Sequence, residues 1–328
     1  IARKIDDKGG EGIYLNNIGN VYHSFDQYPN ALDYYQQSLA IFDEIDYKDG
    51  EGSNLTNLGN VYHSLGQYSK AEDYYQRALV IFREIGNKQG EGSNLVNLGG
   101  VYNSLGQYLK ALDYSQQALI VFKEIDNERG KGKALAGLGN VYNDFGQHSK
   151  SLAYHQQSLA VFREIGDKEA EGKLLTNIGY IYSSLGQYLK AQSSFQDSLK
   201  VLKVMESKDG LWRVQRGLAS TEVHLKQPKD AIHHFEQALD NIEQLRASLT
   251  GSIEKATGLP ARTLKTDFMQ NKFYVYDELI NLYHDQGEDQ KAFETFERKQ
   301  GRAFLEDMAK SGVRRYVDLP VAISQEEE

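Results

Sequence analysis

Hydrophobic residues recur every three or four positions along this chain, and the whole pattern returns after 40 residues. In one copy, Leu55, Leu58, Gly59 and Tyr62 fall on one face of a helix. A second stripe with the same period follows and comprises Ala71, Tyr74, Tyr75, Ala78, Phe82 and Ile85. Each block therefore predicts two helices, with small residues where the helices approach and Tyr62 filling the space between them.

The repeat itself predicts the architecture. The block from Glu51 to Gly90 aligns with the block from Glu91 to Gly130 without a gap, and five good copies occur. A strict period means stacked units that contact mainly their neighbours, rather than one globular core. We expect an elongated solenoid with a long curved surface, which favours binding of other proteins over catalysis.

Turn residues separate the predicted helices. Gly66 can adopt the left-handed conformation that ends a helix, and it recurs as Gly106, Gly146 and Gly186, with Asp26 in the first repeat. The second helix of each unit ends near Asp46, Gly86, Asp126 or Gly166. The next residues are Tyr47, Asn87, Asn127 and Asp167. The last three of these are good helix N-caps, so we expect the next unit to begin there.

The period also sets the predicted boundaries. Residues 1–10 align with the end of a second helix, so we interpret them as the remnant of a preceding repeat. Six helix pairs follow in 11–250, the sixth degenerate because Ala219 and Glu222 replace glycine and tyrosine. We expect a loop at 251–263, a longer helix hairpin at 264–312, and a linker or disordered tail at 313–328.

The repeated residues carry a family resemblance. Leu55, Leu58, Gly59, Tyr62, Ala71, Tyr75 and Ala78 resemble the tetratricopeptide repeat at its proper spacing, in a 40-residue form similar to the repeats of kinesin light chain and Pins/LGN. The resemblance implies an all-α fold, a right-handed superhelical solenoid of antiparallel helix pairs. It also implies that the first helix of each pair lines a concave groove that binds a peptide or protein.

A second resemblance covers the C-terminal part. The stretch from Phe296 to Ala309 resembles the helix that precedes the CHAT protease domain in bacterial proteins of the same repeat class. It implies a sensor or recruitment arm whose protease would lie beyond Glu328, so no protease residue is assigned here. A capping helix with an acidic tail is the alternative. A stand-alone adaptor, or an array that self-associates end to end through the truncated N-terminal repeat, are alternative functions.

Composition narrows the function classes. The 328 residues carry a net charge of −9, which argues against nucleic acid as the main partner. No cysteine is present, and no apolar run approaches the length of a membrane span. A cytoplasmic location fits both facts. The eight histidines form no zinc motif and no phosphate-binding loop occurs. We therefore expect no catalytic residue, no metal and no cofactor.

The candidate binding residues are those that the hydrophobic stripe leaves on the inner face of the first helices. They are Asn20, His23, Asn60, His63, Asn103, Lys133, Asn140, Asn143, Lys173, Tyr180, Arg213 and Arg216. An asparagine amide offers donors and an acceptor to a peptide backbone, which is the role that the resemblance implies. Solvating the groove or bonding the neighbouring helix is the alternative. Gly100 interrupts this asparagine ladder and leaves room for a ligand side chain.

Two further features concern the same face. Lys133, Lys173, Arg213 and Arg216 predict a basic C-terminal half of the groove, suited to an acidic or extended peptide or a terminal carboxylate. A second ladder, Asn17, Asn57, Asn97 and Asn177, is expected to bond between adjacent repeats. Trp212 stands at a usual glycine position, where packing or ligand contact would explain it.

Overall fold

Helices form wherever the apolar residues keep their three- and four-residue spacing. The computed structural model describes residues 7–24, 27–205, 207–257 and 272–310, which contain fourteen helices and no strand. Six pairs run in order: α1 (Lys8–Ser24) and α2 (Tyr28–Glu44), α3 (Lys48–Ser64) and α4 (Tyr68–Glu84), α5 (Lys88–Ser104) and α6 (Tyr108–Glu124), α7 (Glu128–Asp144) and α8 (His148–Glu164), α9 (Lys168–Ser184) and α10 (Tyr188–Val204), α11 (Lys208–His224) and α12 (Pro228–Thr257). A last hairpin has α14 (Phe273–Asp285) and α15 (Asp289–Lys310).

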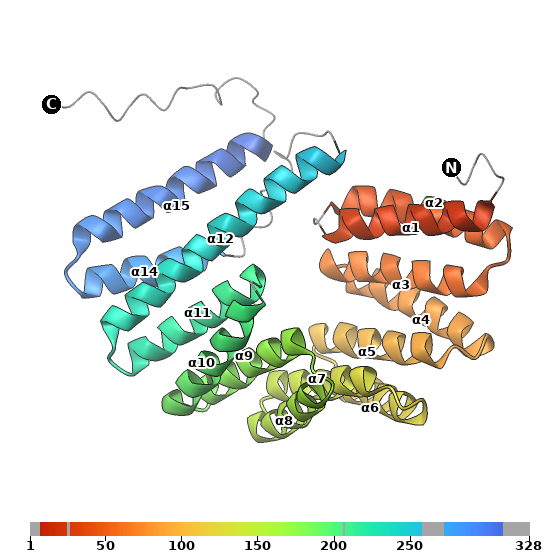
Figure 1. The fold of residues 1–328 in the computed structure, drawn as a ribbon, viewed down its shortest axis with the longest axis horizontal. Coiled ribbons are helices and arrows are strands. Elements are labelled where there is room, and N and C mark those ends of the chain that lie inside the picture. Colours follow the sequence, from red (N-terminus) through yellow and green to blue (C-terminus); the bar gives the residue numbers. More distant parts are fainter. Residues whose placement is uncertain (1–6, 25–26, 206, 258–271, 311–328) are drawn as a thin grey trace.

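The pairs stack into an open arc. Each first helix packs on its own second helix, which in turn contacts the first helix of the next pair. Figure 1 shows α1, α3, α5, α7 and α9 on the inner side of this arc and α4, α6, α8 and α10 on the outer side. The all-α solenoid predicted from the period is confirmed, and the first helices line its concave face.

The predicted turn residues end and start the helices. Gly66 has φ +69°, and Gly106, Gly146 and Gly186 share this left-handed conformation. Asp26 lies outside the described residues. The Asn87 side chain accepts a hydrogen bond from the backbone N–H of Gly90, and Asn127 and Asp167 cap the helices that follow them in the same way. Tyr47 makes no side-chain cap, as its chemistry requires.

A buried ring joins each repeat to the next. The Phe82 ring lies where a Cβ on Gly52 would come within 2.9 Å and one on Gly90 within 2.5 Å. Gly52 lies on α3 of the same helix pair, and Gly90 lies on α5 of the next pair. Phe42, Phe122 and Leu202 occupy the same place between paired glycines. These four joints between repeats therefore depend on one large side chain that meets two residues without a side chain.

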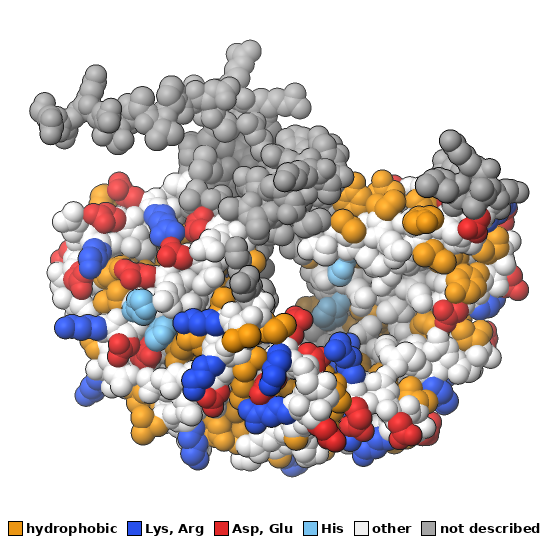
Figure 2. All heavy atoms as spheres, viewed as in Figure 1, with side chains coloured by type: hydrophobic (Ala, Val, Ile, Leu, Met, Phe, Trp, Pro, Cys, Tyr) orange, Lys and Arg blue, Asp and Glu red, His pale blue; other side chains and the backbone are white. Residues whose placement is uncertain are grey.

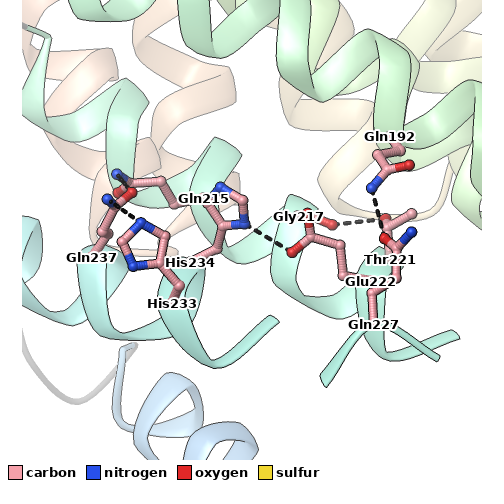
Figure 3. A network of polar contacts seen from close by, with 9 residues as sticks. All are labelled: Gln192, Gln215, Gly217, Thr221, Glu222, Gln227, His233, His234 and Gln237. Carbon is pink, nitrogen blue, oxygen red and sulfur yellow. Dashed lines mark hydrogen bonds and ion pairs between the residues drawn. The ribbon is translucent and has the colours of Figure 1, made fainter. Parts of the chain in front are cut away.

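Stacked tyrosines fill the space within the first four helix pairs, as predicted. Tyr62 and Tyr74 stack with ring centroids 5.3 Å apart and 6° between planes, and the first, third and fourth repeats have the same pair. In the sixth repeat, Glu222 and His234 take these two positions and form a hydrogen bond, with 2.8 Å between the carboxylate oxygen and Nδ1 (Figure 3). The degenerate repeat thus keeps the contact with a different chemistry.

The C-terminal part differs from the sequence expectation. The helix α12 continues through Gly251 to Thr257. The predicted loop at 251–263 was therefore wrong for residues 251–257. One glycine weakens a helix by only about 1 kcal/mol, which the helix formers after it can offset. Residues 258–271 and 311–328 lie outside the described part. Trp212 is buried with Ile242, Val275 and Tyr276, in keeping with a packing role.

Candidate functional site

A cavity of about 620 Å³ opens on the concave face across α5, α7 and α9. It brings together four of the predicted groove residues, Asn103, Lys133, Asn140 and Lys173. Its other lining residues include small ones, among them Gly99, Gly100, Ser115, Ala136 and Gly137. We name this cavity the concave pocket.

Small residues on α5 and α7 make this surface hollow. Gly100 stands where the second repeat has Asn60, and Gly137 stands where it has Asn57. A Cβ built on Gly100 would meet no atom within 4 Å, so open space lies above it. Side chains that cover the inner face in the earlier repeats are therefore absent at the centre of the arc.

A third small residue, Ser115, deepens the pocket from α6. In the first two repeats this position holds Tyr35 and Tyr75, whose hydroxyls donate to Asn20 and Asn60 at 2.8 Å. In the third repeat both partners have changed together, the tyrosine to Ser115 and the asparagine to Gly100. A whole aromatic ring is therefore missing beneath the concave face, and its absence leaves space there.

The fifth repeat shows what normally occupies that space. The Phe195 ring lies against Gly179 of its own repeat and Gly217 of the next, and a Cβ on either glycine would come within 2.6 Å of it. The equivalent places around Ser115 also hold glycines, Gly99 of the third repeat and Gly137 of the fourth. There, the only atom within 4 Å of a Cβ on Gly137 is the Ser115 hydroxyl oxygen, at 3.6 Å.

The two equivalent glycines give a direct test of this vacancy. Gly137→Ala is expected to be neutral or to stabilise the chain by up to about 1 kcal/mol, because alanine is the better helix former and its methyl meets open space. Gly217→Ala is expected to destabilise by about 1–3 kcal/mol, because its methyl collides with the Phe195 ring. Urea unfolding of both variants measures the difference. Equal losses would show that the space beside Gly137 is filled.

The fourth repeat presents the side-chain amide of Asn140 at the concave pocket. His155 stands at the Tyr75 position, is buried, and makes no Nδ1 hydrogen bond. Burial lowers the pKa of His155 to about 4, so its imidazole is neutral at pH 7. Asn140, the counterpart of Asn60, therefore has no tyrosine hydroxyl to bind, and within the described residues its amide has no hydrogen-bond partner. It is the ladder asparagine whose donors and acceptor are open to a ligand.

Charged groups line one end of the concave pocket. Arg129 pairs with Asp167 at 2.9 Å, and Lys173 pairs with Glu169 at 2.6 Å between exposed side chains. Lys133, on α7 between these pairs, has no ion pair within the part of the chain that the structure describes. Figure 2 shows Lys and Arg side chains, mixed with Asp and Glu, along the lower rim of the central opening. Exposed pairs are weak and can exchange partners, whereas Lys133 is already unpaired.

The remaining predicted residues lie outside this pocket and mostly contact the protein itself. His63 packs edge-on against Tyr68, and burial lowers its pKa. His23 lies beside Tyr28, with an angle of 51° between the rings. Asn143 pairs with the His148 ring at 3.1 Å.

The predicted basic half of the groove is partly neutralised by the last hairpin. Arg216 forms a two-point ion pair with Glu278 of α14, with distances of 2.7 and 3.0 Å, and its guanidinium lies over the Tyr274 ring. Tyr180 donates its hydroxyl to the Arg213 carbonyl at 2.8 Å. Arg216 therefore ties the sixth repeat to the hairpin that follows.

The second asparagine ladder bonds between repeats where the structure describes its contacts. The Asn57 amide donates to Asn16 of the first repeat at 3.2 Å, and the Asn97 amide approaches Asn60 at 3.5 Å. Gly137 interrupts this ladder beside the pocket. The expected role of Asn57 and Asn97 is thus confirmed.

The sequence interpretation missed part of the pocket because it considered only the first helices. Ser115 lies on α6, a second helix, and was not considered as a surface residue. Gly137 stands at a position of the second asparagine ladder, which was expected to bond between adjacent repeats. A comparison of the repeats at the Tyr75 position would have singled out Ser115. Among the described residues, no three His, Asp or Glu side chains are placed to hold a metal ion. None of the described helices is both long and apolar enough to cross a bilayer.

Known proteins share this fold. The family model described as tetratricopeptide repeat matches residues 10–84, 90–164, 133–203 and 170–244. Among solved structures, the chain is similar to a Rap protein complexed with competence and sporulation factor (TM-score 0.62, 15% identity, 89% of this chain and 76% of that one). It is also similar to apo RapI (0.60, 15%, 92% and 98%) and to BtubC (BKLC) from P. vanneervenii (0.55, 16%, 67% and 90%). No curated protein matches the sequence. Because the family model covers most of the chain, from the first helix pair to the sixth, this protein belongs to the tetratricopeptide repeat family.

Proposed function

We propose that this protein is a non-catalytic interaction scaffold that binds an extended segment of a partner protein in the concave pocket. The observation that carries the proposal is the hollow on the inner face, where Gly100, Ser115 and Gly137 replace larger residues of other repeats. A vacancy at the centre of a curved, otherwise regular surface is where a ligand can bury most area. The Rap protein that shares the fold was solved with a factor bound, which supports binding as the general role.

The polar groups around the hollow suit an extended acidic segment. Asn140 offers its amide to a peptide backbone, and Asn103 lies across the pocket on α5. Lys133 supplies a cation without an ion-pair partner among the described residues, one turn before Gly137 on the same face of α7. A carboxylate of the ligand would therefore find an available charge without displacing an existing pair.

Charge reversal on the two sides of the arc tests this proposal. Phage-displayed random peptides selected on the wild-type chain are expected to be acidic. Lys133→Glu is expected to weaken their binding about tenfold, since it replaces an attraction with a repulsion. Lys123→Glu, the same change on the outer helix α6, is the matched control and is expected to leave binding unchanged. Fluorescence anisotropy measures both, and equal binding by the two variants would exclude the pocket.

We further propose that the scaffold serves as the sensor arm of a protease of the CHAT type. The segment that carries this resemblance, from Phe296, falls on α15, which continues to Lys310. Reading the gene beyond the codon for Glu328 tests the idea. A following caspase-like domain with one His and one Cys would support it, whereas a stop codon or an unrelated domain would leave a stand-alone adaptor.

One observation favours self-association as a second function. The N-terminal helix α1 exposes Tyr14 at 61% and Val21 at 47%, although their counterparts Asn54 and Val61 are fully buried in the next repeat. An apolar face of this kind can stack on a second copy. Sedimentation velocity over a range of concentrations measures this, and a sedimentation coefficient that stays constant would exclude it.

A further inference from the structure

We propose that the concave pocket takes one tyrosine side chain of the bound partner, in a slot bounded by Gly99, Gly100, Ser115 and Gly137. We name this the aromatic slot. The inference rests on the proposed function, because it names the side chain by which the partner is recognised. It is carried by what the other repeats place in the same space.

The shape of the aromatic slot is that of a ring. In the fifth repeat, the Phe195 ring lies between Gly179 and Gly217, close enough that a Cβ on either would collide with it. Gly99 and Gly137 are the equivalent glycines of the third and fourth repeats, and no ring lies between them. A flat side chain supplied from outside would meet Gly137 on one side and, on the other, the Ser115 hydroxyl that lies against Gly99.

The polarity of the aromatic slot distinguishes tyrosine from phenylalanine. An internal ring such as Tyr75 grows from the outer helix, and its hydroxyl reaches the concave face at Asn60. A ligand ring enters from the concave face, so its far edge points the other way, toward the outer helix. There it meets Ser115, which forms no side-chain hydrogen bond within the described residues. The serine hydroxyl can pair with a phenol, which phenylalanine lacks.

The surroundings of the aromatic slot fix the rest of the ligand motif. Lys133 lies one helical turn before Gly137 and Asn140 one turn after it, on the same face of α7. A ligand with its tyrosine in the slot would therefore place a neighbouring carboxylate near Lys133 and its backbone near Asn140. The partner is thus an extended segment with a tyrosine beside an acidic residue.

The empty slot also has a cost that a ligand would relieve. Glycine in the middle of α7 lowers helix stability relative to alanine, and the vacancy forgoes the contacts that a ring makes in other repeats. A bound ring restores those contacts. The chain is therefore expected to unfold at a higher temperature when the slot is filled, whether by a ligand or by a substituted side chain.

p-Cresol, the tyrosine side chain as a free molecule, probes the aromatic slot without any peptide. In protein labelled with ¹⁵N-glycine, we expect it to shift the amide signals of Gly99, Gly100 and Gly137 and to leave Gly217 unmoved. Ser115→Tyr is expected to abolish these shifts, because it restores the tyrosine that the first two repeats have at this position, Tyr35 and Tyr75. Ser115→Ala keeps the slot open but removes the hydroxyl, so we expect the shifts to remain and to need a higher p-cresol concentration.

A second blocking variant guards against misfolding of the first. Gly137→Leu fills the slot from α7, where a Cβ would collide with no atom and would lie 3.6 Å from the Ser115 hydroxyl. Thermal unfolding identifies which variants are folded. If p-cresol shifts the three glycines equally in wild type and in a folded blocking variant, or shifts none of them, the slot proposal is overturned.

Peptides separate the slot from the broader function. An acidic peptide selected on the wild-type chain, with a single central tyrosine, is compared with its alanine and phenylalanine versions. We expect about 10–100-fold weaker binding with alanine and a smaller loss with phenylalanine. Equal binding of all three would overturn the slot and leave the groove function standing. If no acidic peptide binds the wild-type chain but p-cresol still shifts the glycine signals, the proposed function alone would be overturned.

Discussion

Phe122→Ala is expected to lower the free energy of unfolding by about 3–5 kcal/mol, the range found when a buried phenylalanine is truncated. The ring is 2% exposed and lies against Gly92 of its own repeat and Gly130 of the next. Neither glycine has a side chain that could move into the space, so the cavity would remain open. The loss falls on the joint between α6 and α7, because the ring contacts both sides of it.

The form of the unfolding curve should change as well. Stability in a stacked array depends on the coupling between neighbours, so a weakened joint lets the two halves unfold separately. We expect a broadened or two-step urea transition by circular dichroism. Ile120→Ala on the same helix is the control, because Ile120 is 57% exposed and should cost little. A loss for Phe122→Ala no greater than for the control would contradict the proposed role of the ring.

Acid is expected to destabilise this protein through His155. Burial lowers its pKa from 6.5 to about 4, so between these values the unfolded chain binds a proton that the folded chain does not. Stability is therefore fully present above pH 6.5 and falls as the pH drops toward 4. The difference of about 2.5 pKa units corresponds to a loss of about 3 kcal/mol.

His155→Tyr should remove this acid-dependent loss. Tyrosine is the residue of the first two repeats at this position, and its hydroxyl could donate to Asn140 as Tyr75 donates to Asn60. Urea unfolding at pH 7 and pH 4.5 measures the effect. The wild-type chain should lose more stability than the variant between these two values. Parallel losses in both proteins would show that other groups dominate.

The comparison with the variant is needed because carboxylates also titrate in this range. Burial alone would raise the pKa of Glu91, but hydrogen bonds from Arg83 and Lys88 outweigh it, so the pKa lies below its usual value. Glu171 behaves in the same way. Both groups contribute stability that falls as they are protonated. Their contribution is the same in wild type and His155→Tyr, and it cancels in the difference.

The period of the sequence predicted most of the fold because each unit repeats the same local physics. Gly66 ends a helix and Asn87 starts one in the structure as their backbone chemistry requires. The prediction failed at Gly251, where a glycine was interpreted as a break but the helix α12 continues to Thr257. A glycine commonly ends a helix by adopting a positive φ, and sequence alone does not give that angle.

The candidate site was harder to predict than the fold. Position on the first helix singled out Asn103, Lys133, Asn140 and Lys173, which line one pocket in the structure, and the gap at Gly100 was recognised. Sequence could not tell that the amide oxygens of Asn20 and Asn60 accept hydrogen bonds from tyrosines, since the partners are 15 residues away on another helix. For the same reason it did not reveal the vacancy at Ser115, which depends on glycines from two repeats.

The ring held between two glycines has a consequence for how such a chain can change. The joints at Phe42, Phe82 and Phe122 use the same kind of contact, and none of these three rings lines the concave pocket. A unit can therefore be exchanged for a copy of its neighbour without rebuilding the joints. Replacing the third repeat with a duplicate of the second would put a tyrosine where Ser115 stands and close the slot while leaving the stack intact. Partner choice then becomes a matter of the order in which interchangeable modules are arranged.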